Sequence, residues 1–519
     1  MRYFLRRYQS GEGSQAASPE EAFALAIAWA WLRVLEQKYP ELPQVRAGYW
    51  EEELAALQGV EEERRALART IIGLKVRELG REGLQYNRLG NLVSYRELGK
   101  ELRKKRRRLP LKQLLAQQGE ALFRLLPAWL CSPHAALTLF QGEGAGGNAS
   151  PFDLIIFDES SQIPTAEAFP LLELGRQFVV VGDRQQLKPY TLFRKHYAEA
   201  AIHTEESWLF WAGLYLPDHM LLGHYRARHE ALIAFSNAHF YGGRLRILPD
   251  RATFTAEASP FHYQLVEGTY AAGENVREAE ALVAYLLQQP AIWREKQVGI
   301  LALNQAQSQL LFRLLWEAFS GQIPAGWQVR HLQEVQGEEY DFVCISTVYA
   351  RSAKGYFPSS MGWISLPGGA QRVNVLASRA REHVAVFTGI EAHLIGPGMR
   401  ENDGVRLLLA FLEQAKSFRR RLRPEEKEGV ALGYDPLRAQ TCAHVAGAQV
   451  FPFGSLVDIA LTRADGTFTG ELVLRDRQDW LLGPRLLGPF VYDVAYVRAR
   501  GWKERWCLSP SLFPGRPKV

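Results

Sequence analysis

The sequence predicts a multidomain α/β protein with a helical amino-terminal region, parallel sheets covered by helices, and a small α/β domain at the carboxyl end. Its 519 residues are too many for one core, since a domain usually holds roughly 100 to 200 residues. Hydrophobic residues make up 47% and charged residues 23%, which excludes a disordered or membrane-embedded chain. From residue 152 onward, short apolar runs end in acidic or glycine-rich turns and alternate with helical segments, as in parallel sheets.

Residues 1–110 are expected to form the helical region. Ser18 can cap the first helix, Pro19 suits its first helical position, and Glu21 closes a capping box. A second charged helix is expected around residues 61–79, and it leads into a strongly basic segment.

This basic segment, expected to be helical, holds the densest positive charge of the chain. The run is Arg103-Lys104-Lys105-Arg106-Arg107-Arg108. It is either a solvated helix face or a surface that tracks nucleic-acid phosphates, and in the second case Arg103, Lys104, Arg106 and Arg107 would make the contacts. The net charge of +6 is compatible with a polyanion partner without identifying one.

Three features bear on where the protein works. The apolar stretch 22–32 ends at Arg33, well short of the roughly 18 to 20 residues that a bilayer span needs. No apolar segment with a small-residue cleavage site follows the arginines near the amino terminus. The four cysteines are scattered, which argues against a disulfide framework and against a cysteine-based zinc site. We therefore expect a cytoplasmic protein that has no membrane partner.

The remaining elements divide the chain further. Strands are expected at 153–157, 178–181, 298–302, 342–347 and 384–388, a helix at 229–240, and a basic linker at 418–424. The predicted domains beyond the helical region are residues 111–215, 216–417 and 430–519.

Two adjacent acids, Asp158 and Glu159, directly follow the first expected strand. At the carboxyl end of a parallel strand, one carboxylate can hold Mg²⁺ while the other polarises an attacking water, as hydrolysis of a nucleoside triphosphate requires. A bare Asp-Glu pair is more often an ordinary turn. Here, however, the next expected strand ends in Gly182 and Asp183 and leads to Gln186, whose amide can sense a terminal phosphate. The two features together are far more specific than either alone.

These two motifs and four further ones, in the same order along the chain, resemble those of superfamily 1 helicases. The similarity is to the 5′-to-3′ branch, which includes the nonsense-mediated-decay helicase and the Dna-two-like enzymes, and it covers residues 85–415. The matching segments are 158–159 (motif II), 182–186 (motif III), 222–226 with 235–241 (the Tyr-Arg motif and its trailing helix), 298–301 with Gln307, 335–341 (motif V) and 372–381 (motif VI). The resemblance implies two RecA-like domains that use ATP and Mg²⁺ and bind single-stranded DNA or RNA.

The resemblance also implies roles for single residues around the nucleotide. Asp158 would hold Mg²⁺, Glu159 would act as general base, and Gln186 would contact the γ-phosphate. In motif V, Gly337 and Glu339 are assigned to nucleotide binding, with Glu339 at the ribose.

Two arginines would complete that site from the second RecA-like domain. The resemblance implies that Arg226 and Arg379 stabilise transition-state charge, which makes hydrolysis depend on closure of the two domains. The ordinary alternative for both residues is a surface salt bridge.

One element of the family is missing from this sequence. Superfamily 1 enzymes carry the Walker A loop, Gly-x-x-x-x-Gly-Lys-Ser/Thr, whose backbone amides cradle phosphates and whose lysine reaches the β- and γ-phosphates. Gly99-Lys100 lacks the upstream glycine and the hydroxyl, and the glycines at 142, 144 and 147 precede a strand instead of following one. We expect the chain to begin after this loop, so that the first RecA-like domain is incomplete. Either an amino-terminal chain supplies the loop, or the chain is a relic of a longer helicase.

The carboxyl-terminal domain resembles the small restriction-endonuclease-like domain that is appended to bacterial helicases of this group. Asp458 and Glu471 fit the two acids that hold Mg²⁺ in that fold. The further polar residue expected two positions after the Glu is Val473 here, so a degenerate and inactive centre is expected.

Three functions are therefore compared. The first is a nucleic-acid-dependent ATPase and helicase component without its own Walker A loop, which the acids and arginines favour. The second is a non-catalytic nucleic-acid-binding module, which the missing lysine favours. The third is a nuclease that acts through Asp458 and Glu471.

Overall fold

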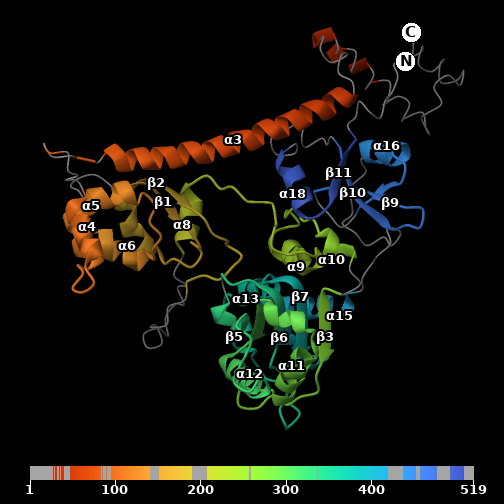
Figure 1. Ribbon diagram of the computed structural model, residues 1–519. Helices are drawn as coiled ribbons and strands as arrows, with labels where there is room; N and C mark the ends of the chain where they lie inside the picture. The colour runs from red at the N-terminus through yellow and green to blue at the C-terminus, as the bar shows by residue number, and fades with distance from the viewer. Residues whose placement is uncertain are drawn as a thin grey trace, which may run out of the picture. The chain divides into compact units, whose positions relative to one another are not determined.

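The computed structural model describes residues 47–82, 95–140, 151–189, 207–255, 259–335, 337–418, 436–451, 456–475 and 491–507, with isolated positions between 27 and 89. Figure 1 labels the helices and strands. The chain divides into a smaller unit, residues 1–66, 432–450 and 457–519, and a larger unit, residues 67–431 with 451–456. Within the described part of the chain, no helix combines the length and the apolar character that crossing a membrane requires.

The described part of the amino-terminal region is helical, as expected. The helix predicted around residues 61–79 is present as part of α3 (Ala47–Glu82), a single helix of 36 residues. The division between the two units falls at residue 66, inside this helix, and the predicted domain bound at residue 110 stays a prediction. The predicted cap at residues 18–21, the glycines at 142–147 and most of the linker 418–424 lie outside the described residues.

The basic run is not the helix that we expected. Helix α4 (Arg96–Arg103) ends at the first residue of the run, and Lys104 is already extended, with φ −62° and ψ 128°. The buried Glu101 explains this end, since its carboxylate accepts hydrogen bonds from the Lys104 ammonium group and from the Leu109 backbone N–H, the latter at 2.6 Å. Repulsion among six adjacent cations also disfavours a further helical turn.

The larger unit contains a two-stranded parallel sheet, β1 (Phe152–Phe157) with β2 (Gly175–Val180). The elements packed on it are α4, α5 (Leu111–Leu125), α6 (Pro133–Phe140), α7 (Thr165–Ala168), η2 (Phe169–Leu174) and α8 (Trp208–Tyr215). One face of the sheet joins their core through Ile155, Phe157 and Val180.

The opposite face of this sheet is bare among the described residues. Leu154 and Ile156 of β1 alternate with the core residues, and Ile156 lies beside Val179 of β2. Their exposed fractions are 47%, 61% and 46%. Parallel sheets are normally covered on both faces, so one covering layer is absent from the described part of the chain. These three residues are called the bare face.

A second sheet in the same unit has five parallel strands in the order β3-β7-β6-β4-β5. The strands are β3 (Phe261–Leu265), β4 (Val298–Ala302), β5 (Trp327–His331), β6 (Tyr340–Ser346) and β7 (Ala380–Thr388). The longer helices are α9 (Ala231–Phe240), α11 (Val276–Gln288), α12 (Gln305–Ala318), α13 (Gly369–Ala377) and α15 (Asp403–Ser417). Short helical segments are α10 (Arg251–Thr255), η3 (Ala291–Glu295), η4 (Leu332–Glu334), η5 (Gly362–Ile364), η6 (Ala392–Leu394) and α14 (Pro397–Arg400).

Alternate residues of the central strands enter two separate cores, one on each face of the second sheet. In β6, Val343 packs with α9, α13 and α15, whereas Cys344 packs with α11 and α12. Strands that are covered on both faces appear in a sequence as continuous apolar runs. The predicted strands accordingly overlap β1 and β2 of the first sheet and β4, β6 and β7 of the second. The sequence did not reveal β3 and β5, which lie at the sheet edges and carry polar residues between apolar ones.

The smaller unit holds a mixed sheet in the order β11-β10-β9-β8, in which only β10 and β11 are parallel. The elements are α16 (Pro436–His444), β8 (Ala448–Val450), β9 (Ile459–Thr462), β10 (Phe468–Leu474), α18 (Asp493–Ala499) and β11 (Lys503–Trp506). A small α/β unit is thus present near the carboxyl end. Its restriction-endonuclease-like identity stays a prediction.

Candidate active site

The two acids of motif II lie in a sharp turn at the carboxyl end of β1. Asp158 and Glu159 are both exposed, and the Glu159 backbone N–H donates to Asp158 Oδ1 at 2.9 Å. Glu159 has φ 50°, an uncommon backbone conformation for a residue other than glycine. The turn is anchored by Ser160, whose N–H donates to the Val181 carbonyl at 2.9 Å and whose hydroxyl donates to the Phe157 carbonyl at 2.8 Å. The strand end therefore presents both carboxylates outward.

Motif III forms the neighbouring turn after β2. A Cβ atom on Gly182 would approach the Ser160 and Ser161 backbone nitrogens to 3.1 Å, so glycine allows the two turns to lie close together. Asp183 organises the turn, because its carboxylate accepts the Gln185 N–H at 2.8 Å and the Gln186 side-chain amide at 3.1 Å.

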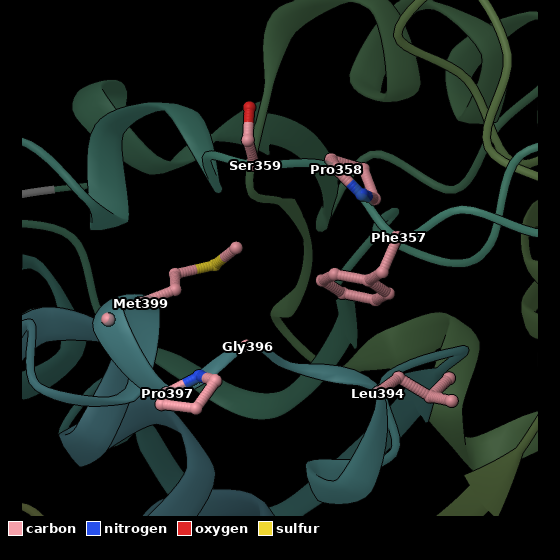
Figure 2. Close-up of a pocket in the computed structure, with 8 residues that line it drawn as sticks. Phe357, Pro358, Ser359, Leu394, Gly396, Pro397 and Met399 are labelled. Carbon is pink, nitrogen blue, oxygen red and sulfur yellow. The ribbon is translucent and has the colours of Figure 1, made fainter.

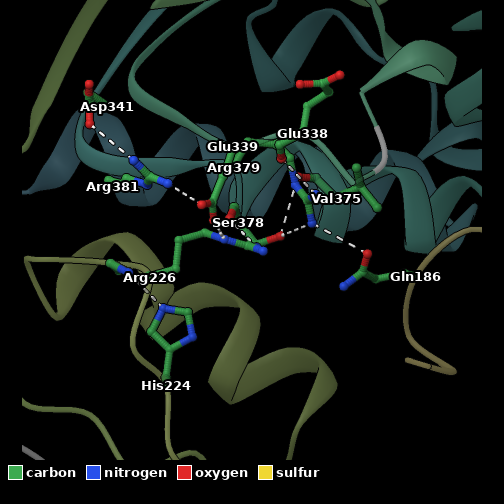
Figure 3. A network of polar contacts seen from close by, with 11 residues as sticks. Gln186, His224, Arg226, Glu338, Glu339, Asp341, Val375, Ser378, Arg379 and Arg381 are labelled. Carbon is green, nitrogen blue, oxygen red and sulfur yellow. Dashed lines mark hydrogen bonds and ion pairs between the residues drawn. The ribbon is translucent and has the colours of Figure 1, made fainter. Parts of the chain in front are cut away.

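Arg379 reaches this turn from motif VI, 193 residues further along the chain. Only 1% of its surface is exposed, and its guanidinium donates to the backbone carbonyls of Val375 and Glu338, both at 3.0 Å (Figure 3). Its Nη2 lies 3.4 Å from the Gln186 side-chain oxygen. Burial, with the Arg226 charge as a smaller cause, lowers the pKa of Arg379 to about 10 while the Glu159 carboxylate opposes the shift. Arg379 is therefore a buried cation at neutral pH, not a surface salt bridge.

Arg226 and Glu339 form the second part of the same network. The Arg226 Nε donates to Glu339 Oε2 at 2.6 Å, and Arg381 donates to the other carboxylate oxygen and lies 3.6 Å from Asp341 (Figure 3). Burial acts to raise the pKa of Glu339, but the two guanidinium groups outweigh it and lower the pKa below its usual value. Glu339 is thus an ion held between two arginines. Nearby, Gly337 adopts a left-handed turn with φ 80°.

The structure therefore groups part of the predicted site. Gln186, Arg226, Glu339 and Arg379 belong to one polar network, and the Glu159 carboxylate is close enough to influence Arg379. Three residues to which the sequence assigned no role also enter it: Asp183, Tyr241 and Asn374. All three lie inside the matching motif segments, but only the folded chain shows what they contact.

The two acids of the predicted nuclease centre belong to neighbouring strands: Asp458 directly precedes β9, and Glu471 lies in β10. The Asp458 carboxylate is bound by Arg475 through two contacts, at 2.5 and 3.2 Å, and lies 3.6 Å from Arg438 of α16. The Arg475 side chain is 2% exposed. Asp458 is thus held by a buried cation of the protein itself.

The basic run is exposed throughout, in keeping with either interpretation of it. Lys104 is paired with the Glu101 carboxylate, and Arg108 Nε donates to the Lys104 carbonyl at 2.7 Å. Arg106 and Arg107 extend the run beyond α4, and Arg107 has a left-handed φ of 52°.

A shallow hollow of about 320 Å³ lies elsewhere in the larger unit (Figure 2). Phe357, Leu394 and Met399 line it together with proline, glycine and serine. The lining has no ionisable side chain, so the hollow does not suit a triphosphate.

The donor set at the ends of β1 and β2 suits magnesium nucleotide chemistry in part. Mg²⁺ prefers a carboxylate oxygen or two together with waters and phosphate oxygens, and Asp158 and Glu159 offer the carboxylates. No group of three or more His, Cys, Asp or Glu side chains in the described part of the chain could hold a metal by itself. Arg226 and Arg379 add two guanidinium groups to the same network.

Comparison with known proteins shows what the chain is similar to, and one match includes Arg226, Glu339 and Arg379 of this network. A family model described as an AAA domain matches residues 209–390. An uncharacterized ATP-dependent helicase of Mycoplasma pneumoniae is 29% identical over 288 residues, 50% of this chain and 25% of the relative. Its counterpart in Mycoplasma genitalium is 27% identical over 318 residues, 56% of this chain and 28% of the relative. Helicase SEN1 of Saccharomyces cerevisiae is 26% identical over 261 residues, 46% of this chain and 11% of the relative.

The chain spans about a quarter of the length of the two Mycoplasma relatives. The expected fold class, an α/β protein with RecA-like helicase domains, is confirmed by the parallel sheets and by the family match. Residues 209–390 thus belong to an AAA domain of the superfamily 1 helicase type.

Proposed function

We propose that this chain is a component of a nucleic-acid-dependent ATPase that couples ATP hydrolysis to the unwinding of DNA or RNA strands. The observation that carries the proposal is the contact between Gln186 of motif III and the buried Arg379 of motif VI, at 3.4 Å. A buried arginine is costly to keep unless its charge is used or compensated. Here its Nη2 faces a phosphate-sensing amide beside the two acids of motif II.

Each residue has a defined role in this proposal. Asp158 binds Mg²⁺, and Glu159 polarises the attacking water. Gln186 and Arg379 contact the transferred phosphoryl group, where preorganised charge stabilises the transition state. When bound, the magnesium ion neutralises charge on the phosphate oxygens.

Arg226 requires a change of partner in order to contribute. Its 2.6 Å bond to Glu339 leaves it neutralised by the carboxylate that the family resemblance assigns to the ribose. Once hydroxyl groups of a ribose engage Glu339, Arg226 becomes available to the phosphates. Arg381, the second cation on Glu339, keeps that carboxylate ionised during the exchange.

We further propose that a polypeptide with a Walker A loop completes the site by covering the bare face of the β1–β2 sheet. The exposure of Ile156 supports a second layer on this sheet, and the two Mycoplasma relatives are about four times longer than the region matched. The carboxyl ends of parallel strands meet at one edge of a sheet, so an added strand would place its phosphate loop beside Asp158.

ATP turnover by the purified chain, with and without single-stranded DNA or RNA, tests the proposal. We expect little or no turnover from the chain alone and nucleic-acid-stimulated turnover once the Walker A polypeptide is added. In that assembly, Glu159→Gln should abolish turnover while nucleotide binding persists. Robust turnover by the chain alone would contradict the need for a partner, and equal loss of binding and turnover in Glu159→Gln would indicate a structural acid.

The arginines give a quantitative check in the same assembly. Arg226→Ala or Arg379→Ala should lower kcat by roughly 10³-fold, as for arginine fingers in other phosphoryl-transfer enzymes. Arg406→Ala is the matched control, because Arg406 is an exposed arginine paired with Asp403 on α15. A loss below about tenfold would place both arginines outside the reacting site.

A non-catalytic nucleic-acid-binding module is the second candidate, favoured by the missing Walker A lysine and the exposed basic run. It predicts nucleic-acid affinity that no nucleotide alters. Failure of every assembly to hydrolyse ATP, together with such unaltered affinity, would favour it over the ATPase.

A further inference from the structure

The hydroxyl of Tyr241 joins the motif III turn to helix α13 of motif VI by two hydrogen bonds. We infer that Tyr241 is a positioning residue, whose hydroxyl closes a latch between the motif III turn and α13 and thereby sets the orientation of the Gln186 amide toward Arg379. The catalytic consequence of this latch depends on the ATPase proposed above, but the latch itself does not.

The contacts of the Tyr241 hydroxyl define the latch. It donates to Asp183 Oδ2 at 2.5 Å and accepts from Asn374 Nδ2 at 3.1 Å. The same Asn374 amide donates to the Gln185 carbonyl at 2.8 Å. Side chain and backbone of the motif III turn are thus both held by groups from the second sheet's helices.

The two anchors of the latch are held firmly. Tyr241 follows the last residue of α9, and the chain turns sharply after it through Gly242 and Gly243, with φ 61° and 71°. The Gly243 N–H donates a hydrogen bond to the Asn237 carbonyl at 2.8 Å. Asn374 has no exposed surface and lies in α13 between the buried Val373 and Val375.

Asp183 connects the Tyr241 hydroxyl to the Gln186 side chain. Asp183 Oδ2 accepts two hydrogen bonds: one from the Tyr241 hydroxyl and one from the Gln186 side-chain NH₂ group, the latter at 3.1 Å. With its NH₂ group bound to a carboxylate, the Gln186 amide can only present its oxygen to the Arg379 guanidinium, at 3.4 Å. A freely rotating amide would present its own donors to that cation half of the time and repel it.

The chemistry of the phenol suits this task. Burial, followed by the Asp183 charge, raises the pKa of Tyr241. The hydroxyl is therefore protonated over the working pH range and serves as a fixed donor to Asp183. Phenylalanine would keep the ring in the partly buried position beside the second sheet's core and would remove only the hydroxyl.

Tyr241→Phe in the full chain tests the inference by hydrogen exchange. The Gln185 and Gln186 backbone N–H groups both donate to Asp183, at 2.8 and 3.2 Å, so they report the order of the turn. We expect their exchange to accelerate at least tenfold while α9 and β7 keep their protection. Tyr270→Phe is the matched control, because Tyr270 is another partly buried tyrosine beside the same core.

A second variant and a kinetic readout complete the test. Asn374→Asp removes the other donor of the latch and places a carboxylate near Asp183, so it should accelerate the same two amides at least as much. In the ATP-hydrolysing assembly, Tyr241→Phe should lower kcat about tenfold without changing KM for ATP, as expected for a group whose effect is confined to the transition state.

Two results would overturn the inference. One is unchanged exchange at Gln185 and Gln186 in Tyr241→Phe, and the other is a loss of protection spread evenly over α9 and β7, which would show a packing role. Since exchange requires no ATP turnover, these results decide the latch whether or not the proposed ATPase is correct.

Discussion

At the scale of single residues, Glu278 of α11 is a buried carboxyl group whose hydrogen-bond partners are neutral. It has no exposed surface, and one carboxylate oxygen accepts the Ser346 hydroxyl at 2.6 Å and the Val348 N–H at 2.7 Å. The other accepts the Gly389 N–H at 3.0 Å. Val348 has φ 63°, an outlier for a β-branched residue, so Glu278 holds a strained turn beyond β6. Burial outweighs these donors and raises the pKa of Glu278 to about 7.

This buried acid should make stability depend on pH. The folded-state pKa of about 7 lies above the ordinary value of 4.5, so the folded chain binds the proton more tightly than the unfolded chain does. Proton binding by Glu278 stabilises the folded chain fully below the unfolded-state pKa, and this stabilisation is lost as pH rises through the folded-state pKa. Between pH 5 and pH 8 we expect the wild type to lose roughly 2 to 3 kcal/mol of unfolding free energy relative to Glu278→Gln.

Urea unfolding of both proteins at several pH values measures that difference. Glu280→Gln, on the same helix but exposed, is the control and should follow the wild type. A difference between wild type and Glu278→Gln that is constant from pH 5 to pH 8 would show that Glu278 titrates at its ordinary pKa.

At the scale of elements, the end of α4 decides which cations of the basic run are available. Lys104 is engaged by Glu101, whereas Arg106 and Arg107 follow in the exposed segment beyond the helix. Each phosphate contact contributes about 0.7 to the logarithmic salt dependence of single-strand binding. Arg106→Gln with Arg107→Gln should therefore reduce the slope by roughly 1.4 if both contact phosphates, and Lys104→Gln should reduce it less.

Binding of single-stranded DNA and RNA at a series of salt concentrations gives these slopes. Lys100→Gln is the matched control, since Lys100 pairs with Glu97 on α4. An unaltered slope in the double variant would leave the run as a solvated surface.

The sheet of the smaller unit carries the third prediction. Arg475 is buried against Asp458, so Asp458→Ala leaves a buried cation without its closest partner. We expect a loss of roughly 3 to 5 kcal/mol in this unit, against less than about 1 kcal/mol for the partly buried Glu471→Ala. Hydrogen exchange of β9 and β10 in the full chain measures both.

The same variants test the predicted nuclease. Supercoiled and single-stranded DNA incubated with the full chain in Mn²⁺ should stay intact, because Arg475 occupies the Asp458 carboxylate and Val473 cannot activate water. Nicking by the wild type that Asp458→Ala lacks would restore the nuclease hypothesis.

At the scale of the whole molecule, the bare face of the first sheet carries the fourth prediction. Ile156→Asp should weaken association with the Walker A polypeptide at least tenfold, because a carboxylate would be buried in the new core. Leu130→Asp, at a fully exposed leucine away from the sheet, is the control and should leave association unchanged. Light scattering of the full chain with and without that polypeptide measures association.

The contrary outcomes are distinct. Equal association of wild type and Ile156→Asp would place the partner elsewhere. Self-association of the chain that Ile156→Asp abolishes would show that a second copy covers the face.

The sequence by itself determined the elements whose signal is local. The run 298–302 is apolar at nearly every position because β4 is buried on both faces, and this made it recognisable. The order of the motifs along the chain likewise predicted the helicase type. The edge strands β3 and β5 were not predicted, because their half-exposed residues mix polar and apolar types.

Only the tertiary structure decided which distant groups meet. Gln186 and Arg379 come together across 193 residues through the packing of two sheets, and Asp458 meets Arg475 because β9 pairs with β10. The end of α4 depends on Glu101, whose carboxylate accepts from a backbone N–H eight residues away. Periodicity reports the surroundings of each residue along its own strand or helix, whereas such contacts depend on register and packing between segments.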